Sequence, residues 1–291
     1  GGGGGGGGGG DDELTLEPPA TGFQLRTPDM TLAPGEEKTF CYYTTLPSEA
    51  AGGVHLWESA MTPGSHHMIV YLLDSLPEPD GTVDESGNCG FLAGDLSPRW
   101  VYASQDPESN TPLPDGVGIS VATRQPVVMQ MHYLNASDQP LDTHVLLNGH
   151  TYESGVEYQE AHAYITYNDQ ININPGQEGA VQGSCPLPAD AKFFILSTHT
   201  HQFSTQVQVT DGGSMVLETD DWEHPGFRLW EDAPYYSFGG NLGYRCEYFN
   251  TSDTVVHDGE SAATDEMCMV VGYFIGGGGD AACLNNLAVA L

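Results

Sequence analysis

The sequence predicts an all-β protein built from antiparallel β-sandwiches. From Phe23 onward, short runs of β-branched and aromatic residues alternate with clusters of Gly, Pro, Asn and Asp, which are turn residues. No segment shows the periodicity of an amphipathic helix. With 291 residues and 39% apolar content, the chain can form one large core or two ordinary ones, and two domains are the better expectation.

Eight runs carry the strongest strand signal, and turn signals such as Asn174-Pro175-Gly176 lie between them. In chain order, the expected strands are 38–44, 68–73, 127–134, 161–167, 193–199, 204–210, 244–249 and 267–275. The polar, glycine-containing stretch at 150–159 marks the expected domain boundary. We therefore expect one domain at 23–157 and a second at 158–291.

The N-terminal segment has a different composition. Residues 1–10 are all glycine, and Asp11, Asp12 and Glu13 follow them. Such a segment cannot bury enough surface to offset the entropy lost on ordering. Residues 1–22 are therefore expected to form a flexible tether, which would space the domains from a cell surface if it is natural.

The charge balance excludes two classes of partner. The chain holds 7 Lys and Arg against 40 Asp and Glu, a net charge of −33. Nucleic acids and anionic membrane surfaces would be repelled by this charge. No apolar run reaches the length of a membrane span, so membrane insertion is not expected either.

The cysteine pattern favours disulfides over a thiolate metal site. The six cysteines are widely spaced and contain no Cys-x-x-Cys pair. An even number of such cysteines is typical of a protein of an oxidising compartment, so a secreted or cell-surface location is expected. Six cysteines allow 15 pairings, and the sequence alone does not choose among them.

Two histidine motifs could bind metal. His199 and His201 are two residues apart at the end of an expected strand, where they would project to the same face and could reach one ion. His66 and His67 are adjacent, so both rings could converge only if the backbone bulges or turns there. The His199/His201 motif could instead be a surface coincidence or part of a core hydrogen-bond network.

Two further residues complete two possible ligand sets. His132 lies on the expected strand 127–134, where a lone histidine is more often packed in the core than bound to metal. Met267 would by default fill the core, but it adjoins Cys268, whose disulfide could hold the thioether in place. Three imidazoles accept several first-row metals, whereas two imidazoles with a thioether favour copper.

These segments, in this order, resemble the copper type II, ascorbate-dependent monooxygenases, the family of peptidylglycine α-hydroxylating monooxygenase and dopamine β-monooxygenase. The similarity runs from about residue 32 along nearly the whole chain. Its elements are Pro34-Gly35-Glu36, Thr39-Phe40-Cys41, His66-His67, Pro114-Asp115-Gly116, Gln130-Met131-His132-Tyr133, Pro175-Gly176-Gln177, His199-Thr200-His201, Phe238-Gly239-Gly240, Arg245-Cys246 and Asp265-Glu266-Met267-Cys268.

The resemblance implies a fold and two metal sites. The fold would be two jelly-roll-like antiparallel β-sandwich domains packed side by side, each holding one copper ion. His66, His67 and His132 would form the electron-accepting site, and His199, His201 and Met267 the catalytic site, where oxygen and substrate meet. Electrons would cross a gap between the domains. The implied disulfides are Cys41–Cys89, Cys185–Cys283 and Cys246–Cys268.

The implied activity is hydroxylation of a C–H bond in a small organic substrate, with O2 and an external one-electron reductant such as ascorbate. In the peptidylglycine enzyme an arginine, an asparagine and a tyrosine hold the peptide carboxylate. The corresponding residues here are Ser197, Met269 and Val271, none of which suits that anion. A neutral or cationic, fairly apolar molecule is therefore the expected substrate.

Two other functions fit the same residues. A secreted copper-binding or electron-transfer protein would need the same ligands but would not hydroxylate a substrate. A zinc hydrolase could use His66, His67 and His132, although it would leave the second ligand set without a role.

Overall fold

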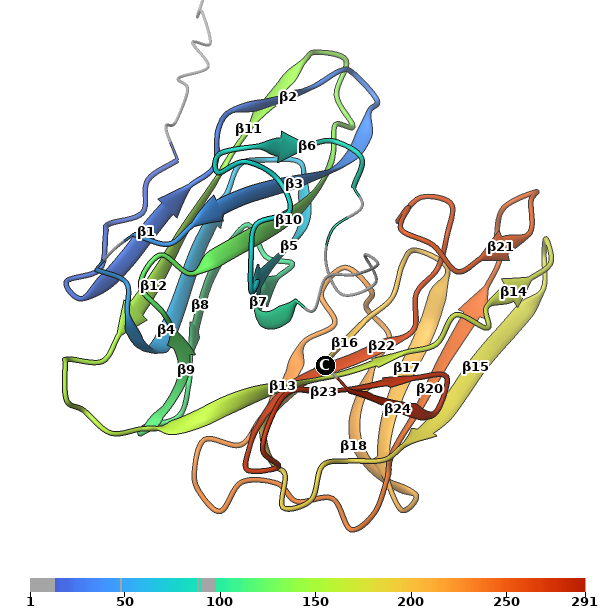
Figure 1. The fold of residues 1–291 in the computed structure, drawn as a ribbon. Helices are drawn as coiled ribbons and strands as arrows, with labels where there is room; N and C mark the ends of the chain where they lie inside the picture. Colours follow the sequence, from blue (N-terminus) through green and yellow to red (C-terminus); the bar gives the residue numbers. More distant parts are fainter. Residues whose placement is uncertain (1–13, 48, 88, 90–97, 291) are drawn as a thin grey trace, which may run out of the picture.

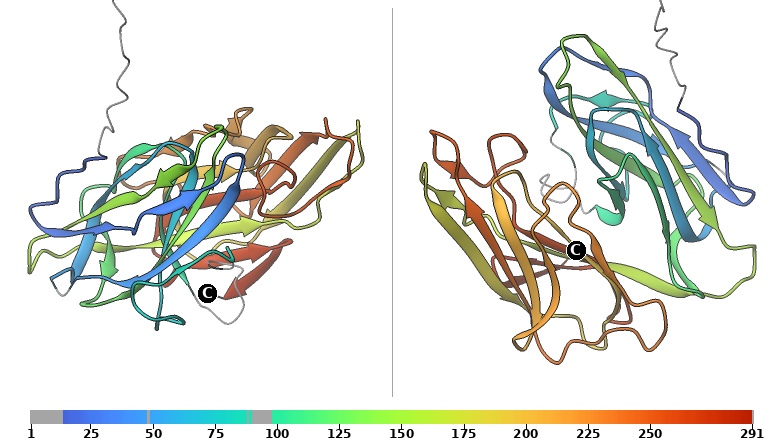
Figure 2. Two further views of the ribbon diagram at one scale, coloured as in Figure 1. Left: turned by 90° about the horizontal axis from the view of Figure 1, so that it is seen from above. Right: turned by 180° about the vertical axis from the view of Figure 1, so that it is seen from behind.

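The computed structural model describes residues 14–47, 49–87, 89 and 98–290, and in this part of the chain every regular element is a β-strand. The all-β expectation is confirmed. Figure 1 shows two sandwiches side by side, one from each half of the chain, and Figure 2 shows the same arrangement from two further directions.

The first sandwich packs two sheets against each other. One sheet has the order β1 (Gly22–Arg26), β12 (Val145–Thr151), β4 (Gly52–Met61) and β9 (Val117–Val121), with β8 (Glu108–Pro112) also paired to β4. The other has the order β6 (Val83–Asp84), β3 (Glu37–Thr45), β10 (Pro126–Leu134), β5 (Ser65–Leu72) and β7 (Arg99–Ser104). Buried Phe40, Trp57 and Met129 belong to the core between them.

The second sandwich is built in the same way. One sheet has the order β13 (Gln159–Tyr167), β22 (Met269–Ile275), β16 (Lys192–His199) and β19 (Phe227–Leu229), extended beside β13 by β23 (Ala281–Leu284) and β24 (Leu287–Ala290). The facing sheet has the order β15 (Glu178–Cys185), β20 (Leu242–Phe249), β17 (Ser204–Asp211) and β18 (Ser214–Thr219). Two short ribbons complete the fold, β2 (Met30–Leu32) with β11 (Leu141–Thr143) and β14 (Asn172–Ile173) with β21 (Val256–His257).

The two sandwiches are joined by backbone and by an apolar contact. Strands β9 and β13 pair in parallel over two residues, which makes one continuous 11-stranded sheet. A separate buried cluster contains Tyr71 and Val128 of the first sandwich and Ile165 and Met269 of the second. The β3–β10–β5 sheet therefore faces the β13–β22–β16 sheet across the junction. The expected boundary at 157/158 falls between β12 and β13.

The expected strands all correspond to observed ones, and the differences lie at their ends and between them. Strand β22 begins at Met269 rather than at residue 267. Strands β4 and β12 were not expected. Strand β4 begins with two glycines, and β12 contains Gly149. Because glycine weakens the β-strand signal, periodicity alone does not find these strands.

Part of the expected tether lies against the first sandwich. Its residues 1–13 fall outside the described residues. Beyond them, the carbonyl oxygen of Leu16 accepts a hydrogen bond from Gln24 at 2.7 Å, and that of Glu17 accepts one from Asn148 at 2.7 Å. Strand β1 then begins at Gly22, the last residue of the expected tether.

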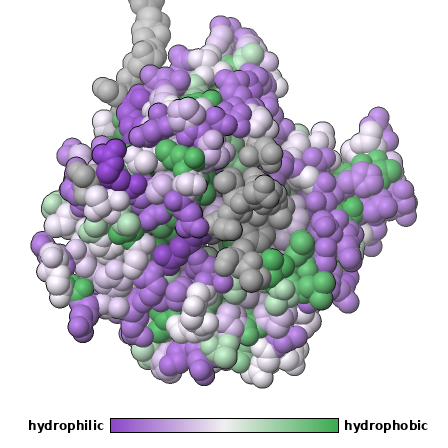
Figure 3. Space-filling model, in the orientation of Figure 1, coloured by the Kyte–Doolittle hydropathy of each residue, from purple (hydrophilic) through white to green (hydrophobic). Residues whose placement is uncertain are grey.

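Figure 3 shows that hydrophilic residues cover most of the visible face and that apolar residues are scattered in small patches. This surface agrees with the net charge of −33. The described part of the chain holds no helix able to cross a membrane.

The three disulfides implied by the resemblance are confirmed. They join Cys41 to Cys89, Cys185 to Cys283, and Cys246 to Cys268. Disulfides of this kind form and persist in oxidising compartments.

Loss of the Cys246–Cys268 bridge should destabilise the second sandwich. The two cysteines are 22 residues apart in the sequence. Removing a disulfide that closes a loop of this size lowers the free energy of unfolding by about 3 kcal/mol. Urea unfolding of the Cys246→Ser/Cys268→Ser double variant measures this loss. An unfolding free energy equal to that of the native chain would show that the bridge does not constrain the fold.

Candidate metal centre

The first three histidines converge because the strand that carries two of them bulges. On β5 and β10, His67 pairs with His132, and the next pair joins Ser65 to Tyr133. His66 is therefore the extra residue of a β-bulge, which turns its ring toward its neighbours. The predicted bulge is confirmed. One ring nitrogen from each of the three histidines lies within 4.8 Å of the others.

The nitrogens that face this cluster have no other partner. His66 Nε2, His67 Nδ1 and His132 Nδ1 are buried and accept no hydrogen bond from the described residues. Burial lowers the pKa of His66, and burial together with the neighbouring rings holds the pKa of His67 well below its usual value. The two rings are therefore neutral and carry free lone pairs. A bound cation is the partner that such orphaned nitrogens fit.

Glu37 fixes the orientation of His132. Its carboxylate oxygen lies 2.9 Å from His132 Nε2, and this hydrogen bond lowers the Glu37 pKa to about 2. Because an ionised carboxylate can only accept, Nε2 must carry the proton, which leaves Nδ1 free to bind a metal. Glu37 also accepts hydrogen bonds from Ser261 Oγ at 3.0 Å and from the Ala262 amide at 3.1 Å. One carboxylate thus links the first ligand set to the second sandwich.

The second histidine pair also presents free nitrogens. His199 Nδ1 donates to Gln105 Oε1 at 3.0 Å, and His201 Nδ1 donates to the Asp265 carbonyl at 3.2 Å. Each ring therefore offers Nε2 as a ligand atom, and His201 Nε2 is buried without a partner. The two ring centroids are 5.2 Å apart. Burial is the main cause that lowers both pKa values, for His201 to about 3.

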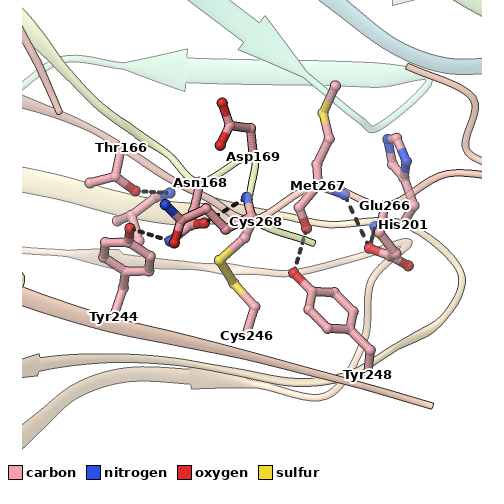
Figure 4. The surroundings of a disulfide bond; sticks show 12 residues. Thr166, Asn168, Asp169, His201, Tyr244, Cys246, Tyr248, Glu266, Met267 and Cys268 are labelled. Carbon is pink, nitrogen blue, oxygen red and sulfur yellow. Dashed lines mark hydrogen bonds between the residues drawn. A yellow bond between two sulfur atoms is a disulfide. The ribbon is translucent and has the colours of Figure 1, made fainter. Parts of the chain in front are cut away.

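Met267 lies beside this pair. Strand pairing sets His199 opposite Met269, and Met267 and His201 each lie two residues beyond that pair. Figure 4 shows that the Met267 side chain and the His201 ring project to the same side, away from the Cys246–Cys268 disulfide. Met267 is buried and lines one cavity together with His67 and His199. Ligation by its sulfur stays a prediction.

Glu266 binds the backbone amides of two candidate ligands, His201 and Met267. Its fully buried carboxylate accepts hydrogen bonds from the amides of His201 at 3.0 Å, Phe203 at 2.7 Å and Met267 at 3.2 Å. The turn after β16 and the segment before β22 are thereby fixed to each other. Sequence reasoning assigned no role to Glu266, because a single acidic residue gives no spacing signal.

The two ligand sets are in contact. The His66 ring centroid is 6.0 Å from those of both His199 and His201, and the His67 centroid is 5.3 Å from that of His199. Five imidazole rings from two sandwiches thus form one cluster. The resemblance implied a gap for electrons to cross, whereas here the two sets adjoin.

The other six histidines lie outside this cluster. Five of these six contact a carboxylate or an aromatic ring, in the pairs His150–Glu58, His144–Asp29, His162–Asp280, His224–Asp221 and His55–Tyr152.

Comparisons with known proteins give no family. No family model matches the chain, and no curated protein matches it. The solved structures similar to it include the major capsid protein P2 of bacteriophage PM2, with 9% identity over 86% of this chain and 97% of that one and a TM-score of 0.31. The PBCV-1 VP54 protein has 7% identity over 89% and 95% and a TM-score of 0.25. Scores this low carry no inference about function.

Proposed function

We propose that this chain is a copper-dependent monooxygenase that hydroxylates a C–H bond of a small organic substrate, using O2 and an external one-electron reductant such as ascorbate. The observation that carries the proposal is the cluster of five buried or half-buried histidines, four of which have a buried ring nitrogen without a partner, beside a buried thioether. Two imidazoles with a thioether form a soft ligand set that favours copper over zinc.

The ligand residues divide the work between two ions. His66, His67 and His132 would hold one ion, and His199, His201 and Met267 would hold the other. Bound copper would supply one-electron redox chemistry and the activation of dioxygen. Burial lowers the pKa of the His66, His67, His199 and His201 rings. Hydrogen bonds to Glu37, Gln105 and the Asp265 carbonyl fix the tautomers of three ligand rings, those of His132, His199 and His201.

The surroundings of the second set argue against peptide substrates. Ser197 Oγ donates to the Gly226 carbonyl at 2.6 Å, and Met269 and Val271 offer no polar group. A peptide carboxylate would lose its water here and gain no cation in return. We therefore expect no hydroxylation of glycine-extended peptides.

Oxygen uptake tests the proposal. The copper-loaded chain should consume O2 in the presence of ascorbate and a suitable substrate, and the metal-free chain should not. A chain that binds copper and accepts electrons but consumes no O2 with any substrate of a broad screen would favour the electron-transfer alternative. Metal analysis that finds one zinc ion and no copper would favour the hydrolase.

A further inference from the structure

The ligand strands continue away from the histidine cluster as the walls of a cavity. The cavity measures about 1000 Å³ and lies between the β5–β7 face of the first sandwich and the β13–β22–β16 face of the second. Such a volume is at the upper end of the range that holds drug-sized ligands. His67, His199 and Met267 line this cavity, so it borders both proposed metal sites.

The floor of the cavity is a grid of side chains set by strand register. Alternate residues of a strand point to one face, and the pairing of β13, β22 and β16 places such residues side by side. Three rows follow from the pairs, and all of their members line the cavity. The rows are Tyr167–Met269–His199, Ile165–Val271–Ser197 and Ala163–Tyr273–Ile195. From Met269 to Tyr273 the grid runs about 13 Å along β22.

The opposite wall is equally uncharged. On β5 the alternate residues His67, Ile69 and Tyr71 line the cavity, and Trp100 of β7 contacts Tyr71 edge to face with ring centroids 5.4 Å apart. Aromatic and aliphatic faces on both sides favour an apolar molecule lying between them.

Among the described lining residues, every carboxylate, lysine and arginine lies outside the three rows of the floor. Of the carboxylates that line the cavity, all except Glu37 are exposed to solvent, and Glu37 is engaged with His132. The only lysine or arginine in the lining of the described cavity is Lys38, which is held by Glu36 at 2.8 Å and Glu85 at 3.1 Å. An anion would meet no unpaired lysine or arginine among the described lining residues, and a cation would meet carboxylates without an ion pair only at solvent-exposed positions outside the apolar floor. A charge of either sign that lay against the floor would lose its hydration without a counter-charge in the three rows.

We propose that this cavity binds an uncharged, elongated and predominantly apolar molecule, with one end against the row of Tyr167, Met269 and His199. Calling this molecule the substrate rests on the proposed function. Its binding does not, because the walls are formed by the chain alone. The sequence suggested a neutral or cationic ligand, and the cavity lining narrows this expectation to a neutral one.

Three probes of one chain length test the proposal. Titration calorimetry on the full chain, both metal-free and copper-loaded, would compare decan-1-ol, decanoate and decylammonium. We expect decan-1-ol to bind at least about tenfold more tightly than either ion, because only the ions must shed a charge hydration shell. Tighter binding of either ion, equal binding of all three, or no binding of decan-1-ol would overturn the proposal.

A charge placed in the floor gives a second test. Val271→Lys should weaken the binding of decan-1-ol and make decanoate the tightest-binding probe. Val255 is an exposed valine outside the cavity, so Val255→Lys should leave the order of the three affinities as in the native chain. Decanoate binding that is the same in both variants would contradict the placement of the ligand. Because the wild-type comparison stands without this variant, poor folding of Val271→Lys leaves the proposal testable. Copper content measured in the same samples separates failure of the cavity from failure of the metal sites.

Discussion

Replacing Met267 with alanine is expected to abolish hydroxylation while leaving the ion at the three-histidine site in place. The thioether is the only soft ligand proposed for the second ion, so its loss should weaken binding of the reduced metal there. The first set holds no sulfur and should keep its affinity. Oxygen uptake under ascorbate and copper content after dialysis measure the two effects on the same sample.

Met269→Ala is the matched control. Met269 and Met267 are both 6% exposed and both line the cavity, but only Met267 is proposed to bind metal. The control removes the same volume and should keep two ions per chain. Turnover retained in Met267→Ala, or the same loss of copper in both variants, would count against sulfur ligation.

Removing the Glu37 carboxylate should lower the affinity of the three-histidine site for its ion about 10- to 100-fold. This is the usual effect of losing the partner that orients a histidine ligand. In Glu37→Ala, the His132 Nε2–H group loses its acceptor and the ring is free to rotate. Competition with a chelator measures the affinity, and the electron paramagnetic resonance spectrum of bound Cu(II) reports the geometry of the site.

A conservative variant and a neighbouring variant serve as controls for Glu37→Ala. Glu37→Gln keeps an oxygen acceptor and should recover part of the affinity. Glu36→Gln removes the neighbouring carboxylate, which pairs with Lys38 rather than with a ligand, and should have no effect. An affinity that stays at the native value in Glu37→Ala would show that His132 does not need this carboxylate.

The strands that carry the candidate ligands could be predicted from the sequence because their signals are local. The alternation around His132 marks a strand, and the adjacent pair His66-His67 can converge only through a bulge, which the register of β5 and β10 contains. The disulfide pairing came from the resemblance, since spacing alone leaves every pairing open.

The supporting residues could not be predicted, because they depend on long-range register. Glu37 reaches His132 from the neighbouring strand β3, and Gln105 reaches His199 from the other sandwich. Contact between the two ligand sets is a property of how the sandwiches pack. No motif in either half of the chain records that packing.

Adjacent ligand sets change what must be tested first. With ring centroids of His67 and His199 only 5.3 Å apart, five histidines could hold either two ions or one shared ion. The monooxygenase proposal requires two, each with its own ligands. A shared ion would leave no separate store for the second electron.

Copper content after reconstitution and dialysis tests this requirement most directly. Two copper ions per chain are expected for the native protein, and one for each of the variants His132→Ala and His201→Ala, which remove ligands of different sets. A native chain that holds only one copper ion and variants that each hold none, or zinc in place of copper in the native chain, would contradict the account.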